Sequence, residues 1–187
     1  MSARLVALPQ IEEAVWRELA LATHDKQHGW RTAVLATLHG DAADARTVIL
    51  READTAARTL TFFTDDRAAK VAQLLSHPNA TLLMWSAALG WQIRCRAVLS
   101  IESNGLAATS RWARIKVSPA AQDYLSRVPP GTAIESPDDA SVGPGPLDRE
   151  HFAVVTAQVH AIDWLELHDA GHRRAVFDAS GARWVQP

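Results

Sequence analysis

Short turns between strand-like segments constrain the fold of this chain more than any other feature. Residues 30–38 read "WRTAVLATL" and residues 46–52 read "RTVILRE", and both are rich in β-branched and apolar side chains. Only the turn at 39–45, which contains glycine and aspartate, separates them. A connection this short allows antiparallel pairing and is too short for a parallel crossover. We therefore expect a mainly β protein built from antiparallel strands.

The rest of the chain supplies more strands, with helices between them. Further strands are expected at 58–64, 80–86, 90–101, 151–167, 172–178 and 182–187. Helices are expected at 9–24, at 104–116, at 119–127, and in a segment that follows the third strand, carries Arg67 and Lys70 in its first turn and stops near Pro78. An antiparallel barrel with peripheral helices is the simplest way to hide the strand edges.

Length and composition indicate a single globular domain over residues 1–187. Residues 129–150 contain eight proline or glycine residues in twenty-two, which predicts a flexible loop. The formal net charge of −2 excludes a global basic field for nucleic acid or an anionic membrane. No apolar run reaches membrane-spanning length and no secretory signal is seen, so we expect a cytoplasmic location.

Cysteine and histidine usage argues against two kinds of site. Cys95 is the only cysteine, which excludes an intrachain disulfide. It alternates with arginines at positions 94 and 96, so we interpret it as a structural thiol. The histidines at positions 151, 160, 168 and 172 do not converge at strand spacing, so no metal site is expected.

Basic residues gather around the second and third strands. Arg46 and Arg51 begin and end the second strand, and Arg67 and Lys70 lie at the next strand-to-helix junction. Cations are unfavourable at a helix N-terminus unless an anion is bound there. The spacing leaves two alternatives open. The four cations converge on a phosphate group, or they are solvated charges balanced by nearby acidic residues.

An ordered series of motifs adds to this reading. The strand "RTVILRE", the strand end "FFT", the arginine and lysine at the next helix, the "HPN" before the next strand, and "WQI" follow one another between residues 46 and 93. A tryptophan and "HRRAVF" follow near the C-terminus. This series resembles the flavin-binding core of the pyridoxamine 5′-phosphate oxidase family. The resemblance implies a six-stranded antiparallel split β-barrel that forms a homodimer, with FMN at the subunit interface.

The resemblance also implies roles for individual residues. Its cofactor-binding positions are Arg46, Thr47, Val48, Ile49, Leu50, Arg51, Phe63, Thr64, Arg67, Lys70, Gln92, Trp164 and Arg174, and its candidate catalytic residue is His172. Arg46, Arg67 and Lys70 fall where the family holds the FMN phosphate. Gln92 falls where the family hydrogen-bonds the flavin ring. Trp164 and Arg174 match residues that reach the same flavin from the other subunit.

The chain departs from the family where the vitamin B6 enzyme grips its substrate phosphate. Our alignment puts Val117 and Ala121 in place of an arginine and a serine, with Arg114 or Lys116 as possible substitutes. Ala170 replaces a further arginine two residues before His172. We therefore expect an FMN-binding oxidoreductase whose small-molecule substrate is unidentified. The alternatives are an authentic pyridoxamine or pyridoxine 5′-phosphate oxidase and a non-catalytic flavin-binding protein.

Overall fold

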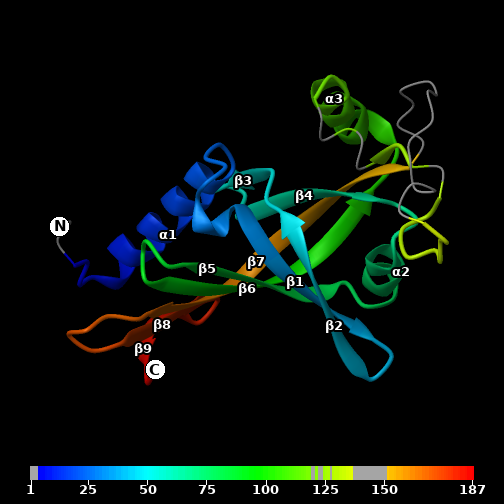
Figure 1. Ribbon diagram of the computed structural model, residues 1–187. Helices are drawn as coiled ribbons and strands as arrows, with labels where there is room; N and C mark the ends of the chain where they lie inside the picture. Colours follow the sequence, from blue (N-terminus) through cyan, green and yellow to red (C-terminus); the bar gives the residue numbers. More distant parts are fainter. Residues whose placement is uncertain (1–3, 119–120, 122–123, 127, 137–150) are drawn as a thin grey trace.

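A computed structural model describes residues 4–118, 121, 124–126, 128–136 and 151–187 of the chain. The strand order is β2-β1-β5-β6-β7-β4-β3, and β8 and β9 extend the sheet beyond β7 (Figure 1). The strands are β1 (Thr32–His39), β2 (Ala42–Ile49), β3 (Glu52–Asp54), β4 (Thr59–Asp65), β5 (Asn79–Ser86), β6 (Trp91–Glu102), β7 (Phe152–Glu166), β8 (Arg173–Asp178) and β9 (Gly181–Val185). Every ladder is antiparallel, as the short turns predict.

The count of six strands implied by the resemblance is not what the described residues show. They form one nine-stranded sheet whose ordered path ends at β2 and β3. The length of β7, 15 residues, explains much of the difference. Its first half pairs with β4 and its second half with β8, so the sheet continues past the expected strands.

Helices cover parts of this sheet. They are α1 (Leu8–Ala22), the short 3₁₀ helix η1 (Gly29–Arg31), α2 (Ala69–Ser76) and α3 (Gly105–Ile115). None of the described helices is long and apolar enough to cross a membrane. The helix expected at 119–127 falls largely outside the described residues, as does the 137–150 part of the expected loop.

Two local differences from the sequence expectations have simple backbone causes. The turn expected over 39–45 contains only Gly40 and Asp41, because a left-handed φ of 61° at Gly40 allows a tight reversal. As a result β2 begins at Ala42, before Arg46. The expected helix begins at Ala69, so Arg67 precedes it and only Lys70 lies in its first turn.

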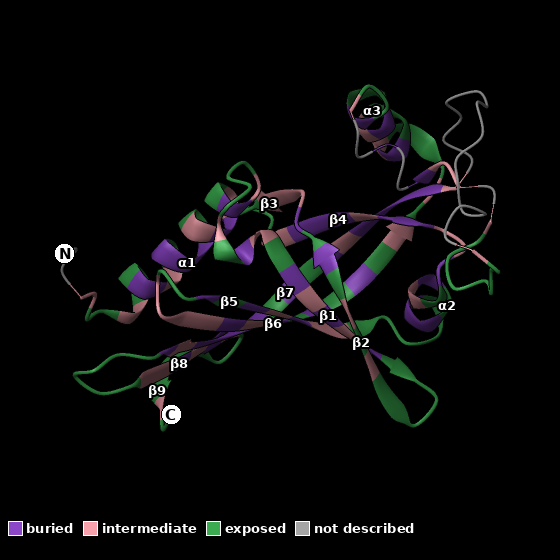
Figure 2. Ribbon diagram, viewed as in Figure 1, coloured by how far each residue is buried: buried purple, intermediate pink, exposed green. Residues whose placement is uncertain are grey.

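The main core lies between the sheet and α1. The largest fully buried side chains include Trp30, Phe62 and Trp164, and Ile11 and Leu19 of α1 pack into the same cluster. A smaller cluster joins α3 to the start of β7. Figure 2 shows the contrast between this buried interior and the exposed tip of the β1–β2 hairpin. Cys95 belongs to the main core, as the alternation predicted, and burial raises its pKa to about 12.

The role of α2 in the core gives a testable pair of substitutions. Leu74 is 2% exposed and its neighbour Leu75 is 73% exposed. Leu74→Ala should lower the free energy of unfolding by about 2–5 kcal/mol, because it leaves a cavity in the core. Leu75→Ala should change it by less than about 0.5 kcal/mol. Equal losses in urea unfolding of the two variants would contradict this placement of α2.

Candidate functional site

A cationic pair forms where β2, β4 and α2 meet. Arg46 of β2 and Lys70 of α2 lie close enough that the charge of Arg46 affects Lys70. Burial, and then the charge of Arg46, lower the pKa of Lys70, while Asp65 acts in the opposite direction. The Lys70 ammonium donates to the hydroxyl of buried Thr64 over 3.1 Å. Two partly buried cations and a buried hydroxyl therefore lie in the same region.

Gln73 organises the guanidinium of Arg46. Its side-chain oxygen accepts from Arg46 at 2.8 Å and from the Thr37 hydroxyl at 2.7 Å. Its amide nitrogen lies 2.9 Å from the His39 ring and donates to Asp44 at 2.8 Å. Asp44 also pairs with Arg46. The hydrogen bond from Gln73, together with Arg46, lowers the pKa of the exposed Asp44 carboxyl. Arg46 is thus held in one orientation from two sides.

Arg67, the third cation at this junction, pairs with a buried carboxylate. Its guanidinium donates to the buried Asp65 carboxylate at 3.0 and 2.6 Å and to the Ser126 carbonyl at 2.8 Å. Its backbone N–H also donates to Asp65. The charge of Arg67 is therefore balanced by the Asp65 carboxylate, whereas Lys70 donates a hydrogen bond to a neutral hydroxyl. Of the three expected phosphate-binding cations, the structure brings Arg46 and Lys70 together most directly.

The four residues after Arg46 continue along β2 and just past it. Thr47 and Ile49 are exposed on one face, and Val48 and Leu50 are buried on the other. Strand alternation produces this arrangement. β2 has β1 as its only strand neighbour in the described sheet, so its other edge offers backbone groups to a ligand.

Arg51 lies in a cavity of about 270 Å³ at the other end of this segment. Its guanidinium lies over the ring of Phe63 at 5.8 Å from the centroid, within the range of a cation–π contact. Its Nε is buried and lacks a hydrogen-bond partner among the described residues. Arg31 lines the same cavity, and burial together with the charge of Arg51 lowers the pKa of Arg31. The cavity wall therefore contains neighbouring cations and an unsatisfied donor.

Two arginines of α3 and one carboxylate complete this wall. Arg111 donates to Glu52 at 3.0 and 2.6 Å, and Arg114 reaches the same carboxylate at 3.3 Å. Ser118 also lines the cavity. The lining residues thus comprise four arginines and one glutamate. Because only one carboxylate faces four guanidinium groups, the cavity favours an anionic ligand.

Val117 and Ala121, which our alignment put at the substrate-grip positions, both lie away from this cavity. Val117 is 82% exposed and Ala121 is 1% exposed in the small core, and neither lines the cavity. Arg114, near the end of α3, and Ser118, three residues past that end, line it instead. The end of α3 therefore places other residues at this cavity than those that our alignment put at the substrate-grip positions.

A third group lies on the outer face of the sheet. Gln92 is directly opposite Leu165 of β7, and Leu165 is opposite Arg174 of β8, so all three share one face. Arg174 donates to the Asp163 carboxylate from Nε at 2.9 Å and from a terminal nitrogen at 2.8 Å. The Gln92 side chain has no hydrogen bond to another described residue, which leaves its amide available to a ligand.

Trp164 and His172 lie apart from the cationic residues of the same chain. Trp164 is 0% exposed in the core, where its ring packs edge-on against Trp91 at 5.3 Å between centroids. His172 lies in the exposed turn before β8, and its ring nitrogen accepts from the backbone N–H of His168 at 3.2 Å. Among the described residues, neither side chain forms a hydrogen bond or ring contact with Arg46, Lys70 or Arg51.

The expected site residues thus fall into separate groups rather than one site. Arg46, Thr64 and Lys70 lie by α2, whereas Arg174 lies on the β8–β9 hairpin at the opposite end of the sheet (Figure 1). A single chain therefore does not gather all of them around one ligand. In the described part of the chain, no group of three or more histidine, cysteine or acidic side chains is arranged to hold a metal ion.

Sequence reasoning missed several residues that shape these groups. Around Arg46 these are Thr37, Asp44 and Gln73. In the cavity they are Arg31, Glu52 and Arg111. Beside Arg174 they are Arg94 and Asp163. Only Arg94 carried a signal, because strand alternation placed it on the face opposite the buried Cys95. The others depend on contacts between residues that lie far apart in the sequence.

Comparisons with known proteins agree with this geometry. Residues 13–102 match the family model described as pyridoxamine 5′-phosphate oxidase, FMN-binding domain. No curated protein matches the sequence. Among solved structures, a pyridoxamine 5′-phosphate oxidase-related FMN-binding protein from Nostoc punctiforme is 19% identical, with a TM-score of 0.74 over 98% of this chain and 100% of that one.

Two other solved structures share the fold. PhzG from Burkholderia lata, solved in complex with tetrahydrophenazine-1-carboxylic acid, is 16% identical with a TM-score of 0.75 over 100% of both chains. General Stress Protein 26 from Bacillus anthracis is 16% identical with a TM-score of 0.53 over 80% of this chain and 92% of that one. The resemblance inferred from the sequence is therefore confirmed: residues 13–102 match the FMN-binding domain model of the pyridoxamine 5′-phosphate oxidase family, and the chain shares its fold with these solved structures.

Proposed function

We infer that this protein is an FMN-dependent oxidoreductase that acts, as a homodimer, on a small anionic substrate. The convergence of Arg46 and Lys70 beside Thr64 carries the proposal. Partial burial, and then the charge of Arg46, lower the pKa of Lys70, so an anion that binds between the two cations stabilises the protonated lysine. An FMN phosphate has the charge and the acceptor oxygens that this pair requires. When bound, FMN supplies the hydride chemistry.

The division of the expected residues between two ends of the sheet supports a shared site. Arg46 and Lys70 hold the phosphate end in one subunit, and Arg174 approaches the ring from the partner subunit. The outer face that carries Gln92 also exposes Leu38, Ile49, Trp85 and Val98, each 38–45% exposed. Several large apolar side chains on one sheet face favour burial against a second copy of the chain.

The arginine-lined cavity supports an anionic substrate. Arg51 and Arg31 offer an unsatisfied donor and unbalanced charge, while the Phe63 ring offers a flat apolar surface. A planar ring with a carboxylate or phosphate group matches both features. The complex of the structurally similar PhzG with tetrahydrophenazine-1-carboxylic acid is consistent with this class of ligand. Arg174, at the other end of the ring, would stabilise negative charge on the reduced flavin.

Pyridoxine 5′-phosphate oxidation is the second candidate function. Arg51, Arg114 and Ser118 line one cavity, which favours it more than the sequence did. Against it, Ala170 lies in the exposed turn before β8 and supplies no charge. Oxygen-dependent formation of pyridoxal 5′-phosphate, measured with saturating FMN, separates the two candidates. A yellow protein inert toward all donors and acceptors would instead indicate a flavin carrier.

The phosphate site can be tested by comparing FMN with riboflavin, which lacks the phosphate. Arg46→Gln and Lys70→Gln should each weaken FMN about tenfold or more, because each removes a charge-assisted contact worth about 1.5–3 kcal/mol. Riboflavin affinity should change little in either variant. Arg17→Gln, on an exposed part of α1, serves as the control. Fluorescence titrations that show equal losses for FMN and riboflavin would place the phosphate elsewhere.

The lowered pKa of Lys70 predicts how FMN affinity depends on pH. Lys70 binds the phosphate only when protonated, and burial lowers its pKa in the free protein. FMN affinity should therefore fall as pH rises through that lowered pKa. Lys70→Arg should remove this fall, because arginine stays protonated. A fall of the same size in the Lys70→Arg variant would assign the titration to another group.

Glu52 provides a test of the anion cavity. Glu52→Gln should strengthen binding of pyridoxine 5′-phosphate by about two- to fivefold, since it frees Arg111 and Arg114 from a partly exposed ion pair. Binding of pyridoxine, which lacks the phosphate, should not change. Asp54→Asn on the same strand removes an equal charge without touching these arginines and serves as the matched control. Identical behaviour of the two variants would exclude Glu52 from the anion cavity.

A further inference from the structure

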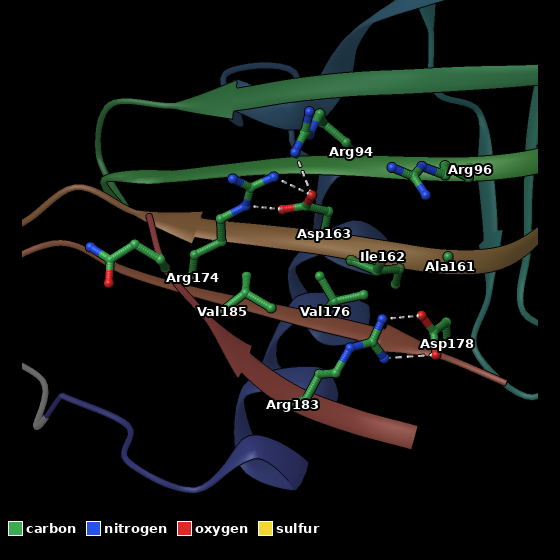
Figure 3. Close-up of a pocket in the computed structure, with 11 residues that line it drawn as sticks. Arg94, Arg96, Ala161, Ile162, Asp163, Arg174, Val176, Asp178, Arg183 and Val185 are labelled. Atoms are coloured by element: carbon green, nitrogen blue, oxygen red, sulfur yellow. Dashed lines mark hydrogen bonds and ion pairs between the residues drawn. The ribbon is translucent and has the colours of Figure 1, made fainter. Parts of the chain in front are cut away.

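Four arginines and two aspartates surround a hollow of about 300 Å³ on the outer face of β6 to β9 (Figure 3). The charged residues are Arg94, Arg96, Asp163, Arg174, Asp178 and Arg183. Only Arg174 among them is expected to contact a flavin. The others require an explanation from their own contacts.

Asp163 holds two of these arginines at once. Its two oxygens accept from the Nε and a terminal nitrogen of Arg174 at 2.9 and 2.8 Å, and one of them also accepts from Arg94. Figure 3 shows both guanidinium groups directed at this one carboxylate from neighbouring strands. Arg94 is directly opposite Asp163 in the β6–β7 ladder, so the sheet register fixes the first contact. Asp163 then fixes Arg174 on the far side.

The burial of Asp163 makes this contact strong. Its side chain is 9% exposed, while those of Arg94 and Arg174 are 38% and 30% exposed. Burial alone would raise the pKa of Asp163. Hydrogen bonds from Arg174 and the charges of both arginines outweigh that effect, so the pKa lies below its ordinary value. The same carboxylate raises the pKa of Arg174. Both partners therefore stay charged across the working pH range.

A second pair in the same hollow has similar chemistry without the burial. Asp178 pairs with Arg183 at 2.7 Å, and their side chains are 24% and 48% exposed. Neither residue contacts Arg174 in the described structure. This pair therefore serves as an internal control for the loss of one aspartate charge at the same hollow.

We propose that Asp163 is a positioning residue that fixes the guanidinium of Arg174, and through the shared carboxylate that of Arg94, for contact with the flavin ring. Gln92 lies on the same face, across Leu165 from Arg174, so the positioned cation and the free amide are presented together. A bidentate carboxylate restricts an arginine to one plane, and a preorganised cation stabilises charge on the ring better than a mobile one. This inference rests on the proposed function, because it requires FMN at the site.

A double-mutant cycle tests the proposal on purified protein. Asp163→Asn should weaken FMN about tenfold and shift the midpoint potential of the bound flavin, as should Arg174→Gln. In the double variant the Asp163→Asn change should add nothing further to either quantity, because Asp163 acts through Arg174. Asp178→Asn should leave both unchanged. If Asp163→Asn fails to fold, Asp163→Glu, which keeps the charge but displaces Arg174, should show the same loss and the same dependence on Arg174.

The outcomes separate this inference from the function on which it rests. Tight FMN binding with an unaltered potential in the Asp163 variants would overturn the positioning role and leave the proposed function standing. Equal shifts with and without Arg174 would likewise overturn it, since Asp163 would then act independently. A wild-type protein that takes up no FMN would overturn both. Non-additive losses confined to the Asp163–Arg174 pair would support the inference.

Discussion

The ladder between β6 and β7 is the interaction on which the rest of the structure depends. It runs from the Trp91–Glu166 pair to the Glu102–Val154 pair, with one register shift between Arg96 and Ala97. This long pairing joins segments separated by the 129–150 region and places Cys95 and Ile162 in the core. It also puts Gln92, Arg94 and Asp163 on the opposite face. A slip of one residue would exchange these two faces.

The remaining groups are built outward from this ladder. β4 pairs with the first half of β7 and carries Phe63 and Thr64 toward the Arg51 cavity and toward Lys70. β8 pairs with the second half and carries Arg174 to the outer face. One strand therefore supports both the phosphate end and the ring end of the proposed flavin site. Because those ends lie at opposite ends of the sheet, the proposal assigns them to different subunits of one FMN site.

The sequence predicted the antiparallel pairing, the buried Cys95 and the FMN-binding resemblance, because these depend on alternation, short turns and local motifs. It did not predict the ring of contacts around Gln73, the carboxylate shared by Arg94 and Arg174, or the α3 arginines in the cavity. Each of these joins residues on separate elements, which no local pattern reports. The sequence did not predict that Ser118 lines this cavity, because our alignment did not fix the end of α3. The homodimer and the individual roles of the site residues stay predictions.

Subunit complementation tests most directly the central claim that two chains share each flavin site. An Arg46→Ala chain lacks the phosphate half, and an Arg174→Ala chain lacks the ring half. Each homodimer alone should bind FMN weakly. Purified heterodimers should regain one wild-type-affinity FMN per dimer, because one of the two flavin sites then combines an intact Arg46 with an intact Arg174. Confirmed heterodimers that bind FMN no better than either parent would contradict the shared site.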